Sequence, residues 1–226
     1  RSAAAGSDGG RLRLTSSGVL ELKSQNTADG SKPVFHLQAG DTDIAQDDEL
    51  GVISFSAPDE GAGTDAILIA AQITAVSEGD FSSSSNATSL LFKTGSSEAA
   101  AEKMRVTSGG QLLIGTTSSD FDDGADNLIV GSGSGDNGIT IYTGSNAGDK
   151  GSIFFADATT GSNAEKKGQI SYEQNNEIMT FFTNHTLAMS IDAAGQITKP
   201  LQPMVEVRAN TTQTIATSGN TKVCAL

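Results

Sequence analysis

The stretch Met104–Leu112, with the sequence Met-Arg-Val-Thr-Ser-Gly-Gly-Gln-Leu, indicates how the chain folds. Apolar residues alternate with other residues on both sides of a central polar, small, glycine segment, and this pattern predicts a tight β-hairpin. The hydroxyl of Thr107 suits the first position of a type I turn, and Gly110, three residues later, suits a positive φ. A type I turn followed by a left-handed glycine is a common hairpin loop.

The same pattern occurs three times along the chain. It is found at Leu12–Leu20 and again at Met189–Ile197, where Asp192 takes the place of Thr107. The glycines at the shared turn position are Gly18, Gly110 and Gly195. Three copies of one turn indicate an internal repeat, and we predict positive φ at all three glycines.

The segments upstream of the last two hairpins also recur in a fixed order. Each copy has a short apolar segment, a strand that begins with Gly and contains Ile and Phe, a Gln-Ile strand, and a Phe-containing strand before the hairpin. We predict strands in the first copy at Val34–Leu37, Gly51–Ala57, Gln72–Thr74 and Leu90–Thr94, and in the second at Ile139–Tyr142, Gly151–Asp157, Gln169–Ser171 and Met179–Thr183.

These recurrences divide the chain into four parts. Residues 1–31 form the end of a preceding repeat and a linker, and residues 32–127 form the first repeat with its linker. The first repeat is the longer one because of an insert around Ser77–Ser89. Residues 128–200 form the second repeat, and residues 201–226 begin a C-terminal head domain. Segments rich in Ser, Gly and Asp at 116–127 and 131–138 are predicted loops. A helix is predicted only at Glu98–Met104.

The composition favours an all-β protein whose copies associate. Hydrophobic residues make up 36% of the 226 residues, and the chain has 26 Gly, 4 Pro and no Trp. Such a chain has few large apolar residues for a core of its own, so inward residues from several copies are expected to share one. The net charge of −13, without a cluster of Lys or Arg, disfavours a nucleic-acid partner and an anionic membrane surface. No apolar run approaches the length of a membrane span.

The sequence offers few candidates for chemistry. The two histidines are interpreted as an outward strand residue, His36, and a turn residue, His185. A single cysteine, Cys224, excludes an intrachain disulfide and a Cys-based zinc cluster. Paired carboxylates occur at Asp47-Asp48-Glu49, Asp59-Glu60 and Asp122-Asp123. These pairs lie in predicted loops, where solvation is the simplest interpretation, with calcium binding or glycoside hydrolysis as alternatives. We predict no catalytic residue, no cofactor site and no metal ligand.

The hairpin and the residues after it resemble a segment of bacteriophage tail fibres. Residues Leu112–Ser118, Leu-Leu-Ile-Gly-Thr-Thr-Ser, are similar to the end of the "MRIDSSGNVGIGTTSP" segment of such fibres, especially in marine and cyanobacterial phages. The strands predicted between residues 151 and 183 resemble those that precede that segment. The likeness covers residues 11–200. This chain differs from the family pattern in lacking the usual proline after Ser118. The segment from Gln202 resembles the entry to a complement-type jelly-roll head found at some fibre tips.

The resemblance implies an elongated, interwoven, all-β homotrimeric fibre. Its expected role is that of a non-enzymatic virion protein, a shaft or spacer of an extracellular tail fibre. The implied partners are two further copies of the chain, other tail or baseplate proteins, and a host receptor bound through the tip. Membrane insertion and nucleic-acid binding are not expected. Two alternatives remain: a polysaccharide-degrading tailspike, which the absence of Trp disfavours, and a bacterial surface adhesin with the same repeats.

Overall fold

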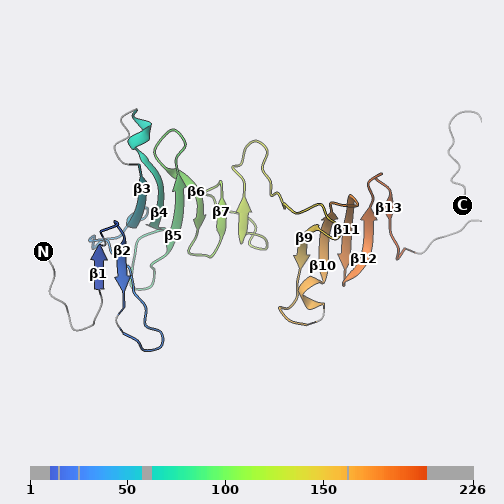
Figure 1. The fold of residues 1–226 in the computed structure, drawn as a ribbon, viewed down its shortest axis with the longest axis horizontal. Helices are drawn as coiled ribbons and strands as arrows, with labels where there is room; N and C mark the ends of the chain where they lie inside the picture. The colour runs from blue at the N-terminus through green and yellow to red at the C-terminus, as the bar shows by residue number, and fades with distance from the viewer. Residues whose placement is uncertain (1–10, 15, 25, 58–62, 162, 203–226) are drawn as a thin grey trace, which may run out of the picture. The chain divides into compact units, whose positions relative to one another are not determined.

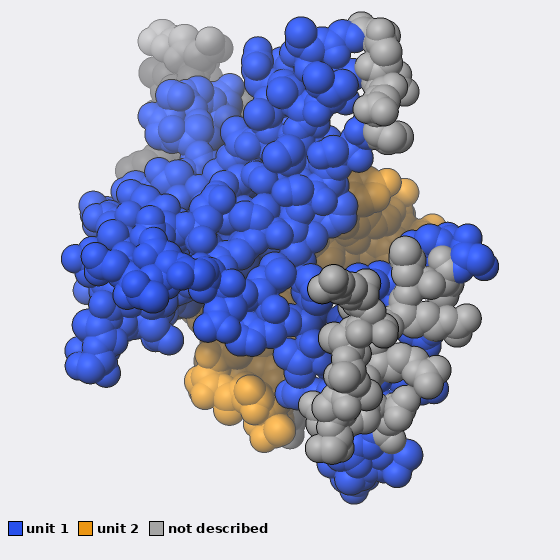
Figure 2. All heavy atoms as spheres, turned by 90° about the vertical axis from the view of Figure 1, so that its left-hand side faces the viewer, with its two compact units in different colours: residues 1–139 blue, residues 140–226 orange. Residues whose placement is uncertain are grey.

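The computed structural model describes residues 11–202 except residues 15, 25, 58–62 and 162. The described chain consists of β-strands with two single-turn 3-10 helices, so the predicted all-β class is confirmed. It divides into two compact units, Arg1–Ile139 and Thr140–Leu226 (Figures 1 and 2). The predicted head domain lies outside the described residues, apart from Leu201 and Gln202.

The first unit contains a six-stranded sheet whose spatial order follows the chain (Figure 1). Strands β3 to β7 form an antiparallel meander, and β8 joins β7 in parallel after a crossover through residues 115–127. A separate hairpin, β1 (Arg11–Leu14) and β2 (Leu20–Lys23), precedes the sheet. The strands of the sheet are β3 (Glu49–Ser56), β4 (Ile69–Ser77), β5 (Thr88–Thr94), β6 (Ala101–Val106), β7 (Leu112–Ile114) and β8 (Leu128–Val130).

The second unit contains a five-stranded antiparallel meander. Its order and pairing match those of β3 to β7, so each of its strands has an equivalent in the first unit. The 3-10 helices occupy the same place in both units, immediately before the second strand of the meander: η1 (Asp65–Ile67) and η2 (Ala164–Lys166). The strands are β9 (Lys150–Phe155), β10 (Gly168–Glu173), β11 (Ile178–Thr183), β12 (Thr186–Ile191) and β13 (Ile197–Thr198).

The helix predicted at Glu98–Met104 is wrong. Its second half belongs to β6, which pairs with β5 so that Met104 lies opposite Phe92 and Glu102 opposite Lys93. A seven-residue helix is marginal in isolation, because nucleation fixes several residues for one hydrogen bond. Pairing with β5 gives ladder hydrogen bonds to the segment from Ala101 onward, and it places Met104 on the apolar side of the sheet. Tertiary pairing therefore overrides the helix propensity of the alanines.

The first predicted strand of each copy is also wrong, because neither Val34–Leu37 nor Ile139–Tyr142 forms a β-strand. These segments instead lie against a sheet face at a glycine. A Cβ added to Gly51 of β3 would lie 2.9 Å from the Cβ of Leu37. At the equivalent Gly151 of β9, an added Cβ would lie 3.2 Å from Cγ2 of Ile141. Leu37 and Ile141 thus lie against the face of the first strand, and the glycine makes that close approach possible.

The glycines of the three hairpin turns share one backbone conformation. The φ angles of Gly18, Gly110 and Gly195 are 81°, 84° and 79°. In the first unit, the amide of Gly110 donates to the carbonyl of Thr107 at 3.0 Å, and the amide of Gln111 donates to the Thr107 hydroxyl at 3.1 Å. The corresponding bonds to the carbonyl and carboxylate of Asp192 measure 2.9 and 2.8 Å. This is the turn geometry that the polar-small-small-Gly pattern encodes.

Residues that are directly paired on neighbouring strands point to the same side of a sheet. On one side of each sheet, these paired residues are apolar across consecutive strands. We call these two surfaces the apolar faces. In the first unit, one paired row on it is Ile53, Ile73, Phe92, Met104, Ile114 and Val130. In the second unit, the equivalent row is Ile153, Ile170, Phe181 and Met189. The row ends remain exposed, with 42% of Ile53 and 52% of Ile153 accessible.

The opposite faces of the two sheets differ, and we call them the second faces. In the first unit, Leu91, Leu113 and Ile129 lie there, and they are the buried apolar residues of the described chain. The crossover lies on this side, because Gln111 Nε2 donates to Asp126 Oδ2 at 2.5 Å. In the second unit, the equivalent row carries the hydroxyl residues Ser152, Ser171, Thr180, Ser190 and Thr198.

Candidate functional site

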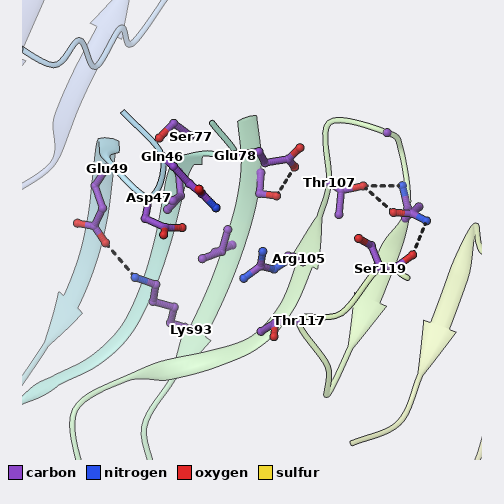
Figure 3. Close-up of a pocket in the computed structure, with 15 residues that line it drawn as sticks. Gln46, Asp47, Glu49, Ser77, Glu78, Lys93, Arg105, Thr107, Thr117 and Ser119 are labelled. Atoms are coloured by element: carbon purple, nitrogen blue, oxygen red, sulfur yellow. Dashed lines mark hydrogen bonds and ion pairs between the residues drawn. The ribbon is translucent and has the colours of Figure 1, made fainter. Parts of the chain in front are cut away.

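A polar hollow with a volume of about 510 Å³ lies on the second face of the first unit (Figure 3). Its floor is the sheet, and its walls come from the loop before β3, the two ends of the β4–β5 insert, the β6–β7 hairpin and the crossover. Its lining residues are Gln46, Asp47, Glu49, Val76, Ser77, Glu78, Ser89, Leu91, Lys93, Arg105, Thr107, Gly109, Gln111, Thr117 and Ser119.

Two cations stand on the floor of the hollow, each held by a carboxylate. Arg105 on β6 donates through Nε and Nη2 to the two carboxylate oxygens of Glu102, both at 2.6 Å. Lys93 Nζ on β5 lies 3.0 Å from Glu49 Oε1 on β3. The bond to Glu102 raises the pKa of Arg105, which therefore remains charged. In Figure 3, Arg105 lies centrally, with Asp47 and Glu49 on one side and Thr107 on the other.

Glu78 joins the insert to the hairpin. Its Oε1 accepts from Ser89 Oγ at 2.5 Å and from the amide of Ser108 at 2.8 Å, while its Oε2 accepts from Ser108 Oγ. Partial burial opposes ionisation of Glu78, but these hydrogen bonds and the charge of Arg105 outweigh it and hold its pKa below the ordinary value. Glu78 is therefore a fixed carboxylate that ties two walls of the hollow together.

Ser77 anchors the loop that forms the opposite wall. Its side chain is almost fully buried, and its hydroxyl donates to the carbonyl of Ala45 and accepts from the amide of Asp48 at 2.9 Å. The amide of Asp47 donates to the Ser77 carbonyl at 3.0 Å. Asp47 itself has a φ of 69°, a left-handed conformation that Asp tolerates better than most residues. The Asp47 side chain is thus presented at the rim of the hollow by a tightly bonded loop.

The second unit has no equivalent set of side chains at these sheet positions. The strand register places Ser190 where the first unit has Arg105, and Phe182 where it has Lys93. A short turn between β10 and β11, at residues 174–177, takes the place of the insert. The second face is instead organised around Ser171, whose Oγ lies 2.7 Å from Thr180 Oγ1.

The described carboxylate pairs are divided between the hollow and local turns. Asp47 and Glu49 line the hollow, whereas Asp48 accepts from the amide of Ala45 at 2.7 Å and closes the loop before β3. Asp122 accepts from the amide of Gly124 at 2.9 Å, which is a local turn bond in the crossover. The pair Asp59-Glu60 lies outside the described residues.

The histidines lie where solvent reaches them. His36 is exposed in a segment that is not a strand, and His185 is exposed in the β11–β12 turn with a φ of 60°. Among the described residues, no three His, Cys, Asp or Glu side chains converge in a way that would hold a metal ion. Within the same part of the chain, no helix is long and apolar enough to cross a membrane.

The hollow itself was not predicted from the sequence. Lys93 and Arg105 lie within segments predicted as strands, but the carboxylates that pair with them come from another strand or from across a bulge. Glu78 is a single acidic residue at the start of the insert. The signal that points to it is the insert itself, a long hydroxyl-rich connection found in one copy only.

No protein-family model matches the sequence, and no curated protein matches it significantly. Among solved structures, the carboxy-terminal domain of the bacteriophage T5 L-shaped tail fibre with its intramolecular chaperone domain is similar over 88% of this chain and 68% of that chain. The TM-score is 0.37 and the identity 14%. A structure of the same carboxy-terminal domain gives 0.36 and 13%, over 87% and 98% of the two chains. Such low TM-scores do not establish a common fold.

Proposed function

We propose that this chain is a structural segment of a bacteriophage tail fibre, of the type found in marine and cyanobacterial phages. It works as a homotrimeric shaft or spacer in the virion, joined to other tail or baseplate proteins, and supports a host-receptor contact at the fibre tip. Residues 32–127 and 128–200 are two copies of one repeat. The hairpin signature and the residues that follow it support the assignment to tail fibres.

The observation that carries the proposal is the exposed apolar surface that each of the two apolar faces retains. Phe55 and Phe155, at equivalent positions of the two first strands, are 53% and 56% exposed. Contiguous apolar surface of this kind marks an interaction surface in a soluble protein. Within each unit, Leu37 and Ile141 lie over this face beside Gly51 and Gly151, but Phe55 and Phe155 remain exposed on it.

A second and third copy of the chain are the partners that fit these faces best. Both units present the same kind of surface at the same register, so the partner must offer matching apolar surface twice along its length. Another copy of the chain carries the same two apolar faces and therefore meets this condition. Homo-oligomers usually associate with closed symmetry. Three apolar faces around an axis would form the core that one copy lacks.

A structural role also suits the chemistry of the hollow. A glycoside hydrolase needs a carboxylic acid whose pKa is raised so that it can donate a proton. The pKa of Glu78 is lowered instead, and Glu49 is paired with Lys93. These carboxylates hold loops and strands together. We therefore propose that the segment cleaves no polysaccharide.

The proposal is tested by placing charges on one face at a time. The double variant Ile53→Asp with Ile153→Asp puts carboxylates on the apolar faces, where desolvation is costly. The matched control, Ser54→Asp with Ser152→Asp, puts them on the second faces. There each serine accepts a bond from a glutamine amide, at 3.2 and 3.3 Å, that a carboxylate can also accept.

Light scattering coupled to size-exclusion chromatography gives the oligomeric state of each variant. We expect a trimer for the unmodified chain and for the serine control, and loss of the trimer for the isoleucine variant. A folded monomer for the unmodified chain, or equal behaviour of the two variants, would contradict the proposal.

A further inference from the structure

We infer that the hollow of the first unit binds a neutral oligosaccharide of two or three sugar residues. The inference deepens the proposed role in host attachment and rests on it for the source of the ligand, a saccharide of the host surface. The shaft would then carry a receptor contact of its own, in addition to the contact at the tip.

The charges that line the hollow favour a neutral ligand. Lys93 and Arg105 are matched by Glu49 and Glu102, and the carboxylates of Asp47 and Glu78 lie at the walls. An anion would meet these carboxylates, and a metal cation would meet the ammonium and guanidinium groups on the floor. A neutral polyhydroxyl molecule can donate to the carboxylates and accept from the cations at the same time.

The remaining lining groups are mostly of the kind that bind sugar hydroxyls. Thr107, Gln111, Thr117 and Ser119 add hydroxyl and amide groups, whereas the apolar contribution comes from Val76 and Leu91. An apolar ligand would leave most of these groups without partners, which is costly. The volume of about 510 Å³ lies within the usual range of small-molecule sites.

The walls of the hollow are fixed before any ligand arrives. Glu78 ties the insert to the hairpin, Ser77 ties the insert to the loop before β3, and Gln111 ties the hairpin to the crossover. Binding to a preformed site avoids the entropy cost of ordering loops. The bonds also explain the insert, because its two ends supply Ser77, Glu78 and Ser89 to the wall.

The site remains accessible in the proposed trimer. Arg105 lies on the second face, opposite the apolar face that the copies of the chain would share, so association does not require this side of the sheet. The second unit provides an internal control, because Ser190 and Phe182 replace the two cations there. One site for each chain, and three for each trimer, is therefore expected.

Saturation-transfer NMR is used to detect binding of maltotriose, cellotriose or mannotriose to the full chain. Each sugar is tested at about 10 mM, where millimolar affinities are detectable. Two variants are compared with the unmodified protein. Gln46→Trp fills the mouth of the hollow from an exposed position, and Gln174→Trp places the same side chain on an exposed glutamine of the second unit. Calcium and inorganic phosphate are tested separately by titration.

We expect at least one trisaccharide to show saturation transfer, at least ten-fold weaker binding in Gln46→Trp, and unchanged binding in Gln174→Trp. All three proteins should keep the same oligomeric state and unfolding midpoint. No transfer from any of the three sugars, equal binding by both variants, or tighter binding of calcium or phosphate in the same hollow would overturn the inference. A trimer that binds no sugar leaves the proposed shaft role standing, whereas a monomer that binds sugar contradicts that role alone.

Discussion

Leu113 in the first unit and Thr198 in the second occupy equivalent positions, each paired with the fourth strand of its meander. Leu113 is fully buried beneath the crossover, whereas Thr198 is exposed in a row of hydroxyl residues. The apolar faces of the same two sheets are alike. The difference shows that one meander can keep a common apolar face while the other face changes with the loops that cover it.

The largest expected effect comes from truncating the covered position. Leu113→Ala should cost about 2–5 kcal/mol of unfolding free energy, because it removes buried methyl groups and leaves a cavity under the crossover. Thr198→Ala, at the equivalent exposed position, should change it by no more than about 0.5 kcal/mol. Urea unfolding of the two variants gives both values. Equal costs would contradict the view that only the first unit has a covered second face.

The hairpin glycines test what the two units share. Gly110→Val and Gly195→Val should each cost at least about 1 kcal/mol, since a β-branched residue resists a φ near 80°. Gly109→Ala is the control, because its added Cβ would meet Thr107 Oγ1 at an ordinary 3.6 Å. Thermal unfolding monitored by circular dichroism measures the three variants. A control as damaging as the valine variants would show that the turn conformation is not the cause.

Two hydroxyls at the second faces should respond with opposite signs. Thr180→Val deprives the buried hydroxyl of Ser171 of its partner at 2.7 Å, which should cost about 1 kcal/mol. Thr74, equivalent to Ser171, is fully buried, and its hydroxyl has no hydrogen-bond partner among the described residues. Thr74→Val should therefore leave stability unchanged or raise it by up to about 1 kcal/mol. Urea midpoints check both signs, and a loss in Thr74→Val would reveal a partner.

The smallest effect is the pH dependence that Glu78 gives to the first unit. The folded-state pKa of Glu78 lies below its ordinary value of 4.5, so its ionised form stabilises the fold above that pH. This contribution is lost as the pH falls through the folded-state pKa. Glu78→Gln should be less stable than the unmodified chain at pH 7, and the two should converge below pH 4.5. Glu98→Gln removes the same negative charge from an exposed position, so it is the control for the change in net charge. A gap that persists unchanged at low pH would contradict this role for Glu78.

The sequence was informative where structure is local and less so where it depends on distant segments. The turn pattern around Gly110 is encoded within a few residues, and alternation around Phe92 and Phe181 identified strands correctly. The segment Glu98–Met104 was misjudged because pairing with β5, not its own propensity, decides its conformation. The hollow around Arg105 was missed for the same reason, since four separate loops or turns build its walls.

The central claim is that the apolar faces are shared among three copies of this chain, and native mass spectrometry of the full chain tests it most directly. We predict a dominant species with the mass of three chains of 23.0 kDa. This trimer should no longer form when Ile53 and Ile153 are both replaced by Asp. A folded species with the mass of one chain, stable across concentration and unaffected by those replacements, would contradict the claim.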